Sequence, residues 1–181
     1  RRMIEVLDVP VTLTAPNTAP VGSVVDVVYE GPDEDRDYIS VAEPDEKTRY
    51  IRSGYTRNGS PTEVRMPDTP GLYELRYQFG EGGRILARRP IEVVAVEVTL
   101  TAPDTAPIGS VVDVEWIGPV EDLDYVSVAD PDEKTRYIRY GYTRNGSPSE
   151  VRRPDTPGTY ELRYQLGEGG KILARRPIEV T

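Results

Sequence analysis

The stretch that decides the fold reads DTPGLYELRYQ at residues 68–78 and returns as DTPGTYELRYQ at residues 155–165. In the first copy a Pro-Gly turn precedes a run in which Tyr73, Leu75 and Tyr77 alternate with polar residues. This period of two is typical of a β-strand with one buried face. We therefore expect these three side chains to point inward and the intervening Glu74 and Arg76 to point outward.

The recurrence extends over nearly the whole chain. Residues 11–94 and 98–181 align at a constant offset of 87 without a gap, and 68 of the 84 aligned pairs are identical. A repeat of this length is a whole domain rather than a solenoid unit. We predict two domains with these bounds, joined at residues 95–97 by a short linker that is stiff because it lacks glycine and proline.

The first ten residues match the end of each repeat at the same offset. RRMIEV at residues 1–6 corresponds to RRPIEV at residues 88–93 and at residues 175–180. We interpret residues 1–10 as the last strand of a preceding repeat plus a linker, so the chain is expected to be a fragment of a longer array. The alternative is that Ile4–Val9 is a free strand that adds to the sheet edge of a neighbour.

Each repeat contains short runs rich in Val, Ile, Tyr and Thr, separated by proline and glycine turns, with Ala15–Gly22 expected as one such turn. Glu115 replaces Val28 in the second copy whereas Trp116 replaces Tyr29, which indicates that position 28 faces outward and that Val25, Val27 and Tyr29 face inward. Seven short strands in fewer than ninety residues predict an all-β fold of two tandem immunoglobulin-like (fibronectin-like) β-sandwiches. The seven strands are expected at residues 11–14, 24–29, 38–41, 49–56, 62–66, 72–79 and 84–94.

Several segments carry a family resemblance. DTPGLY at residues 68–73 resembles the tyrosine corner of immunoglobulin-like domains, with Leu75 and Leu162 at the disulfide-cysteine position. Five further segments of the second copy are VTLTAP (98–103), GSVVDVEWIGP (109–119), GYTRNGSP (141–148), TPGTYELRY (156–164) and LARRPI (173–178). In these segments the chain resembles tandem Ig-like modules of bacterial envelope and secreted proteins, often found downstream of von Willebrand factor A domains. This resemblance implies an extracellular or cell-envelope location and a spacing or presenting role, but no ligand site, since the Asp-x-Ser-x-Ser motif of the A domain is absent.

Composition excludes several classes of function. The net charge of −9 disfavours a nucleic-acid partner, which requires a basic face. The chain has no His and no Cys, which removes Ser-His-Asp triads, Cys-His pairs and His-ligated metals. No apolar run approaches the roughly 20 residues of a membrane span, so we expect no membrane insertion. We therefore predict a protein that is not an enzyme and has neither a catalytic site nor a cofactor.

Calcium is the one ion for which the sequence offers ligands. Asp33, Glu34, Asp35 and Asp37 form one oxygen-rich loop, and a second loop spans residues 43–46. Ca²⁺ takes about 6–8 oxygen ligands, but the second repeat loses Asp33 and no EF-hand pattern is present. Solvated acidic turns are the alternative, and we predict no metal site.

One stretch in each repeat combines arginine with tyrosine. Tyr and Arg are common binding anchors, and aromatic faces stack on sugars. The alternative is an edge strand that is guarded by charge against pairing with another sheet. The candidate partner-binding residues are Tyr50, Arg52, Arg57, Tyr137, Arg139, Tyr140 and Arg144.

The loop after the second strand differs between the copies. Val120 replaces Asp33 and Leu123 replaces Arg36. We interpret Val120 and Leu123, together with Val96 of the linker, as an apolar seam between the domains. The alternative is a partner-binding loop.

Two hypotheses of function follow. The first is a structural spacer module of a longer extracellular or cell-envelope repeat protein, which associates with other copies of itself or with adjoining repeats, including as a surface fibre. The alternative is an adhesion module that binds a carbohydrate or a surface protein through the Arg/Tyr-rich strand.

Overall fold

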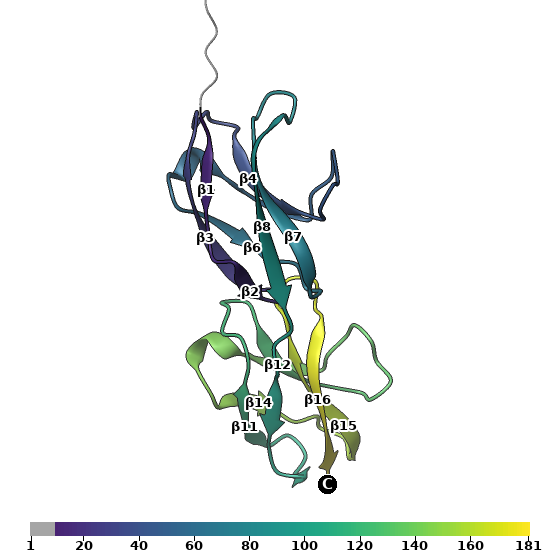
Figure 1. The fold of residues 1–181 in the computed structure, drawn as a ribbon. Coiled ribbons are helices and arrows are strands. Elements are labelled where there is room, and N and C mark those ends of the chain that lie inside the picture. The colour runs from purple at the N-terminus through teal and green to yellow at the C-terminus, as the bar shows by residue number, and fades with distance from the viewer. Residues whose placement is uncertain (1–9) are drawn as a thin grey trace, which may run out of the picture. The chain divides into compact units, whose positions relative to one another are not determined.

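In a computed structural model, which describes residues 10–181, the chain divides between Ala95 and Val96 into two compact units. Each unit contains strands and a single 3-10 turn (Figure 1). The division falls within the predicted linker, and residues 95–98 form no strand. The strand expected at Ile4–Val9 lies outside the described residues. Within residues 10–181, no helix has the length and apolar character needed to cross a membrane.

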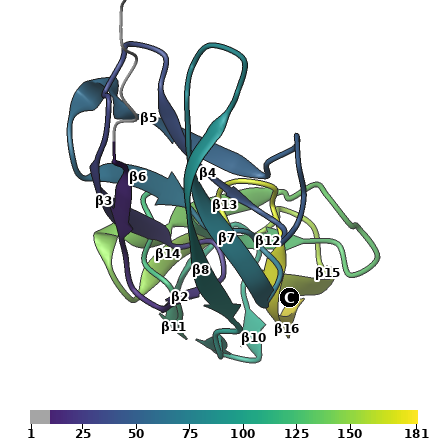
Figure 2. The same cartoon turned by 45° about the horizontal axis from the view of Figure 1, so that its top comes forward.

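The first unit consists of a three-stranded sheet in the order β1-β3-β6 and a five-stranded sheet in the order β2-β8-β7-β4-β5 (Figures 1 and 2). All pairs are antiparallel except β2 with β8. The elements are β1 (Thr12–Thr14), β2 (Thr18–Pro20), β3 (Val24–Glu30), β4 (Tyr38–Ala42), β5 (Arg52–Tyr55), η1 (Thr56–Asn58), β6 (Thr62–Arg65), β7 (Gly71–Gln78) and β8 (Ile85–Val94).

The second unit repeats this topology, with sheets in the orders β14-β11-β9 and β10-β16-β15-β12-β13. Its elements are β9 (Thr99–Thr101), β10 (Thr105–Ala106), β11 (Val111–Ile117), β12 (Tyr125–Ala129), β13 (Arg139–Tyr142), η2 (Thr143–Asn145), β14 (Ser149–Arg152), β15 (Gly158–Gln165) and β16 (Ile172–Val180).

The predicted fold class, two tandem immunoglobulin-like β-sandwiches without a disulfide, is confirmed. Within residues 10–181, however, each unit has eight strands rather than seven. The extra strands are β2 and β10, which lie where the sequence predicted only a proline-rich turn. There the chain leaves the first sheet and pairs in parallel with the last strand of the other sheet, Ala19 opposite Val93. Two or three residues between prolines are too few to give a period-two pattern.

The predicted facing of the core strands is confirmed in the first unit. Val25, Val27 and Tyr29 of β3 are buried, whereas Val28 is 48% exposed. On β7, Leu75 is fully buried where a disulfide cysteine was expected by analogy. At this position an apolar side chain that packs in the core therefore takes the place of a disulfide bond between the sheets.

The tyrosine corner is present in both units. The hydroxyl of Tyr73 donates to the backbone oxygen of Thr69 at 2.9 Å, and that of Tyr160 lies 3.1 Å from the oxygen of Thr156. Both rings are more than nine-tenths buried. The hydrogen bond ties the turn before β7 or β15 to the strand that follows it.

Arg76 lies on the outer face of the five-stranded sheet, as the alternation predicts, but its side chain is only 1% exposed. Its counterpart Arg163 is equally buried. A loop covers each guanidinium and accepts hydrogen bonds from it, which the sequence pattern did not reveal.

Candidate functional site: a tyrosine cluster at the sheet edge

The Arg/Tyr-rich stretch begins in the loop before β5 and continues along that strand, which is the edge strand of the five-stranded sheet. In its antiparallel pairing with β4, Tyr38 lies opposite Tyr55 and Ser40 opposite Ser53. Residues directly opposite share one face of a sheet. The tyrosines and serines therefore occupy the outer face, whereas Arg52, opposite the buried Val41, belongs to the other face.

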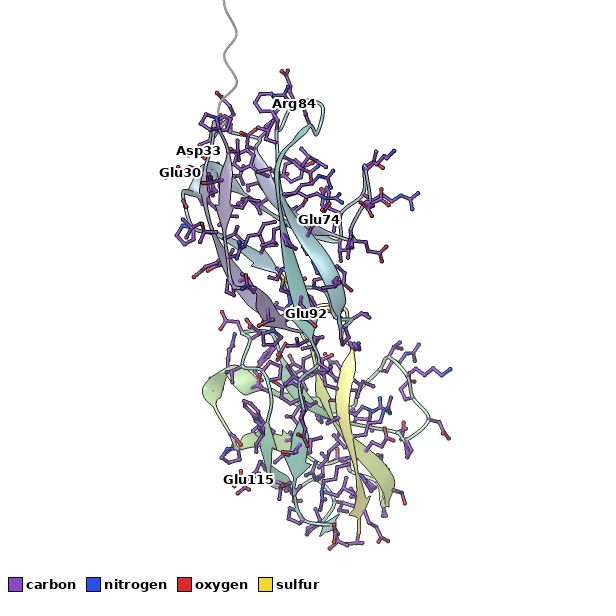
Figure 3. All side chains as sticks on the ribbon, viewed as in Figure 1. Glu30, Asp33, Glu74, Arg84, Glu92 and Glu115 are labelled. Atoms are coloured by element: carbon purple, nitrogen blue, oxygen red, sulfur yellow. The ribbon has the colours of Figure 1, made fainter. Side chains whose placement is uncertain are left out.

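The covering loop, residues 43–51, is held by the buried Arg76. The guanidinium donates to the backbone oxygens of Glu43 and Arg49, at 3.0 and 3.3 Å, and its Nε lies 2.6 Å from Glu74 Oε1. Glu74, labelled on β7 in Figure 3, also pairs with Arg88. Charge-assisted bonds of this kind are about twice as strong as neutral ones. They fix the loop that ends in Tyr50.

The ring centroid of Tyr38 lies 5.5 Å from that of Tyr50 and 6.4 Å from that of Tyr55. We call Tyr38, Tyr50 and Tyr55 the tyrosine cluster of the first unit. The guanidinium of Arg57 stacks 5.0 Å from the centre of the Tyr55 ring, a cation–π contact. Burial and the neighbouring tyrosines raise the pKa of Tyr38 above its ordinary value.

A hollow of about 500 Å³ lies over this cluster. The three rings and Ser53 line it, and Asp35, Arg36 and Arg57 add charged groups. Aromatic walls with polar groups between them are typical of small-ligand sites.

The second unit fills the corresponding place with a fourth ring. Tyr140 stands where the first unit has Ser53, and its ring centroid lies 5.7, 5.0 and 5.1 Å from those of Tyr125, Tyr137 and Tyr142. Arg144 stacks on Tyr142 at 4.6 Å, as Arg57 does on Tyr55. We call these four rings the tyrosine cluster of the second unit.

The structure divides the predicted partner-binding residues into two groups. Tyr50, Tyr137 and Tyr140 belong to the tyrosine clusters, and Arg57 and Arg144 stack on rings of these clusters. The role of these five residues in binding stays a prediction.

Arg52 and Arg139 lie apart from the rings. Arg52 lies 3.8 Å from Asp68 Oδ2, and Arg139 donates to the backbone oxygen of Ile138 at 2.9 Å. The central rings Tyr38 and Tyr125 were missed as site residues. Alternation already placed Tyr38 on the face opposite Ile39. The sequence did not show that the strand of Tyr38 pairs with the Arg/Tyr-rich strand, and this pairing is what brings Tyr38 to the other rings.

The acidic loops use their carboxylates for local structure. Oε1 of Glu46 accepts hydrogen bonds from the backbone N–H groups of residues 47, 48 and 49, which lower the pKa of this carboxyl group. The buried Asp37 accepts from the backbone N–H of Gly80 and from the hydroxyl of Tyr77, both at 2.8 Å. Between residues 10 and 181, no three acidic side chains gather as metal ligands would.

The change from Asp33 to Val120 has an explanation within each unit. The hydroxyl oxygen of Tyr29 lies 2.8 Å from Asp33 Oδ1, whereas Trp116, which replaces Tyr29, donates its Nε1–H to Ser149 Oγ at 3.0 Å. Asp33 is labelled near the end of β3 in Figure 3. Trp116 has no hydroxyl, so a carboxylate at position 120 would have no such hydrogen bond to make. The second unit has a valine at this position.

The second unit also has Ser149 in place of Thr62, so three differences between the repeats form one contacting set. The seam predicted for Val120, Leu123 and Val96 stays a prediction.

No family model and no curated protein matches the chain. Among solved structures it is similar to the BSP domain of a biofilm-associated protein, with 17% identity and a TM-score of 0.38, over 94% of this chain and 29% of that one. It is similar to FdeC, an Escherichia coli adhesin, with 13% identity and a TM-score of 0.34, over 94% and 64%. A marsupial T cell receptor gives 9% identity and a TM-score of 0.35, over 94% and 72%.

The chain therefore spans less than two thirds of the first two of these structures. All three sequence identities are below 25%, so the likeness concerns the fold alone. A position downstream of a von Willebrand factor A domain stays a prediction.

Proposed function

We propose that the chain is a non-catalytic spacer module of a longer extracellular or cell-envelope repeat protein. Its partners are the adjoining repeats of the same chain or other copies of it. The observation that carries this proposal is that the same sandwich is built twice in succession, each time with a complete core.

The core of the second unit illustrates this completeness. The cluster centres on Trp116, Leu162 and Tyr164 and draws all its buried members from residues 106–180. A module that buries its own apolar surface can be added to a chain without redesign of its neighbours. This property favours a repeated spacing element.

A spacer also needs a joint that transmits direction. Residues 95–98, AVEV, contain neither glycine nor proline and separate β8 from β9 by only four residues. A linker this short has little conformational freedom compared with a glycine-serine tether. We infer a stiff joint, with Val96 at its centre.

Residual dipolar couplings and ¹⁵N relaxation of the whole chain test the joint. For a spacer, one alignment tensor and one correlation time fit both units. The matched control carries a Gly-Ser-Gly-Ser insertion between Ala95 and Val96, and its units should require two tensors. Two tensors for the unmodified chain would refute the stiff spacer. Filamentous species in light scattering would replace it with a self-assembling fibre module.

A second candidate is a recognition module for a carbohydrate or a surface protein. The specific observation in its favour is the grouping of exposed rings on one sheet face, with Tyr50 at 47% and Tyr55 at 53% exposure. Exposed aromatic side chains grouped in this way are common at binding sites.

A further inference from the structure

We propose that the hollow over the tyrosine cluster of the first unit binds the pyranose ring of a hexuronic acid, and that the second unit lacks this site. The inference deepens the recognition candidate and does not depend on the spacer proposal.

The size and shape of the occupant follow from the second unit. There the phenol ring of Tyr140 occupies the place above the serine position, 5.0–5.7 Å from three neighbouring ring centroids. The same backbone and three equivalent rings in the first unit therefore leave room for one six-membered ring. Ser53, which lines the hollow, has no ring to fill it.

The groups around the hollow favour a sugar over a second phenol. Asp35, Ser53, Arg36 and Arg57 offer hydrogen-bonding groups on several sides of the same space. A phenol has one hydroxyl to meet them, whereas a pyranose carries several along its edge. Its C–H faces can pack against the tyrosine rings.

The charge of the site favours an acidic sugar. Two arginines, Arg36 and Arg57, and one aspartate, Asp35, are among the residues that line the hollow, in a chain whose net charge is −9. In the second unit Leu123 replaces Arg36, so one guanidinium is lost in the same unit in which Tyr140 fills the space. Arginine pairs with carboxylates in a forked geometry, which suits the carboxylate at C6 of a hexuronic acid.

The test uses the whole chain, isotope-labelled, and pairs of methyl glycosides that differ only at C6. The probes are methyl D-glucuronide with methyl D-glucoside, and methyl D-galacturonide with methyl D-galactoside. We expect one of the two uronides to shift the amide signals of Ser53 and Gly80 but not those of Tyr140 and Gly167. For a single sugar we expect a dissociation constant on the order of 1 mM.

Variants taken from the other repeat sharpen the test, because the chain already tolerates them once. S53Y fills the hollow and should weaken binding of the uronide at least tenfold. R36L should reduce the affinity for the uronide to that for the neutral sugar of the same pair. Y140S with L123R should create a second site in the second unit. L72T is the matched control: Leu72 is 68% exposed near the far end of β7, and the second repeat has Thr159 there.

Four outcomes would overturn the proposal: equal binding of uronide and neutral sugar, binding unchanged by S53Y, no shift with either uronide, or saturation of the hollow by N-acetyl-tyrosine amide instead. The last result would indicate a peptide partner. None of these outcomes bears on the joint between the units, so failure here and failure of the spacer proposal are distinguishable.

Discussion

Arg153 is buried in the second unit without a hydrogen-bond partner, and its replacement should stabilise that unit. Its side chain is 1% exposed, and Nε, Nη1 and Nη2 have no hydrogen-bond partner. The first unit has the fully buried Met66 at this position. R153M therefore exchanges an unpaired buried guanidinium for a side chain that the same fold already accommodates.

The magnitude follows from the pKa. Burial lowers the pKa of Arg153 from its ordinary value to about 10, and each pKa unit of this lowering corresponds to about 1.4 kcal/mol. The charged side chain therefore costs the second unit about 3 kcal/mol at neutral pH. Because the folded-state pKa is the lower one, this cost diminishes only as the pH rises above about 10. We expect R153M to raise the free energy of unfolding by about 3 kcal/mol, and the melting temperature by roughly 10–20 °C.

The assay is specific for the second unit because Trp116 is the only tryptophan of the chain and lies in that core. Urea unfolding followed by its fluorescence reports the second unit alone. R152M is the matched control: its neighbour Arg152 is exposed and only 3.9 Å from the exposed Asp155, so the change should stay within about 0.5 kcal/mol. A midpoint for R153M equal to or below that of the unmodified chain would show that the guanidinium is paired.

Further predictions concern buried polar groups. R163M removes the hydrogen bonds from the Arg163 guanidinium to the backbone oxygen of Asp130 and to the Glu161 carboxylate. It should lower the stability of the second unit by about 2–3 kcal/mol and speed amide exchange at residues 131–137. Unchanged exchange would contradict the role of Arg163 in holding this loop. Y29W overfills the first core and should cost about 2 kcal/mol in calorimetry, with partial recovery when T62S and D33V are added; no recovery would separate these three positions. Burial, aided by Asp37 and Asp124, raises the pKa values of Tyr77 and Tyr164, so stability should fall as the pH rises above 10. Absorbance at 295 nm should then show both tyrosines ionising only on unfolding, and early ionisation of all twelve tyrosines would refute this.

The alternation of apolar and polar residues and the repetition of the sequence predicted the architecture. Alternation reflects the geometry of the strand backbone, and repetition shows that the same fold occurs twice. The pattern of Tyr73, Leu75 and Tyr77 identified one buried strand face. At position 29 both repeats carry an aromatic ring, Tyr29 or Trp116, and this supported the inward facing of that position on the strand at residues 24–29. Such patterns state which face a residue occupies. They do not state what covers that face, and the burial of Arg76 under its loop was therefore missed.

The candidate site was only partly predictable for a related reason. The Arg/Tyr stretch was visible as a local enrichment, but the alternation within it separates Arg52 from the tyrosines once the strand pairs with β4. The hollow itself depends on stretches that are separated in sequence: residues 35–38, residues 50–57 and Gly80. A single substitution, Ser53 for Tyr140, opens or fills it, and no sequence period signals that difference.

The coupled set of Tyr29, Asp33 and Thr62 has a consequence for folding next to a near-identical copy. Neighbouring domains so similar are prone to misassembly in which one supplies a strand to the other. If β3 entered the second unit, the hydroxyl of Tyr29 would meet Val120, and Ser149 would lose the donor that Trp116 provides. In the reverse exchange an indole would be forced against Thr62. The few core differences between the repeats thus make each sandwich favour its own strand, and they discourage tangling between adjacent domains.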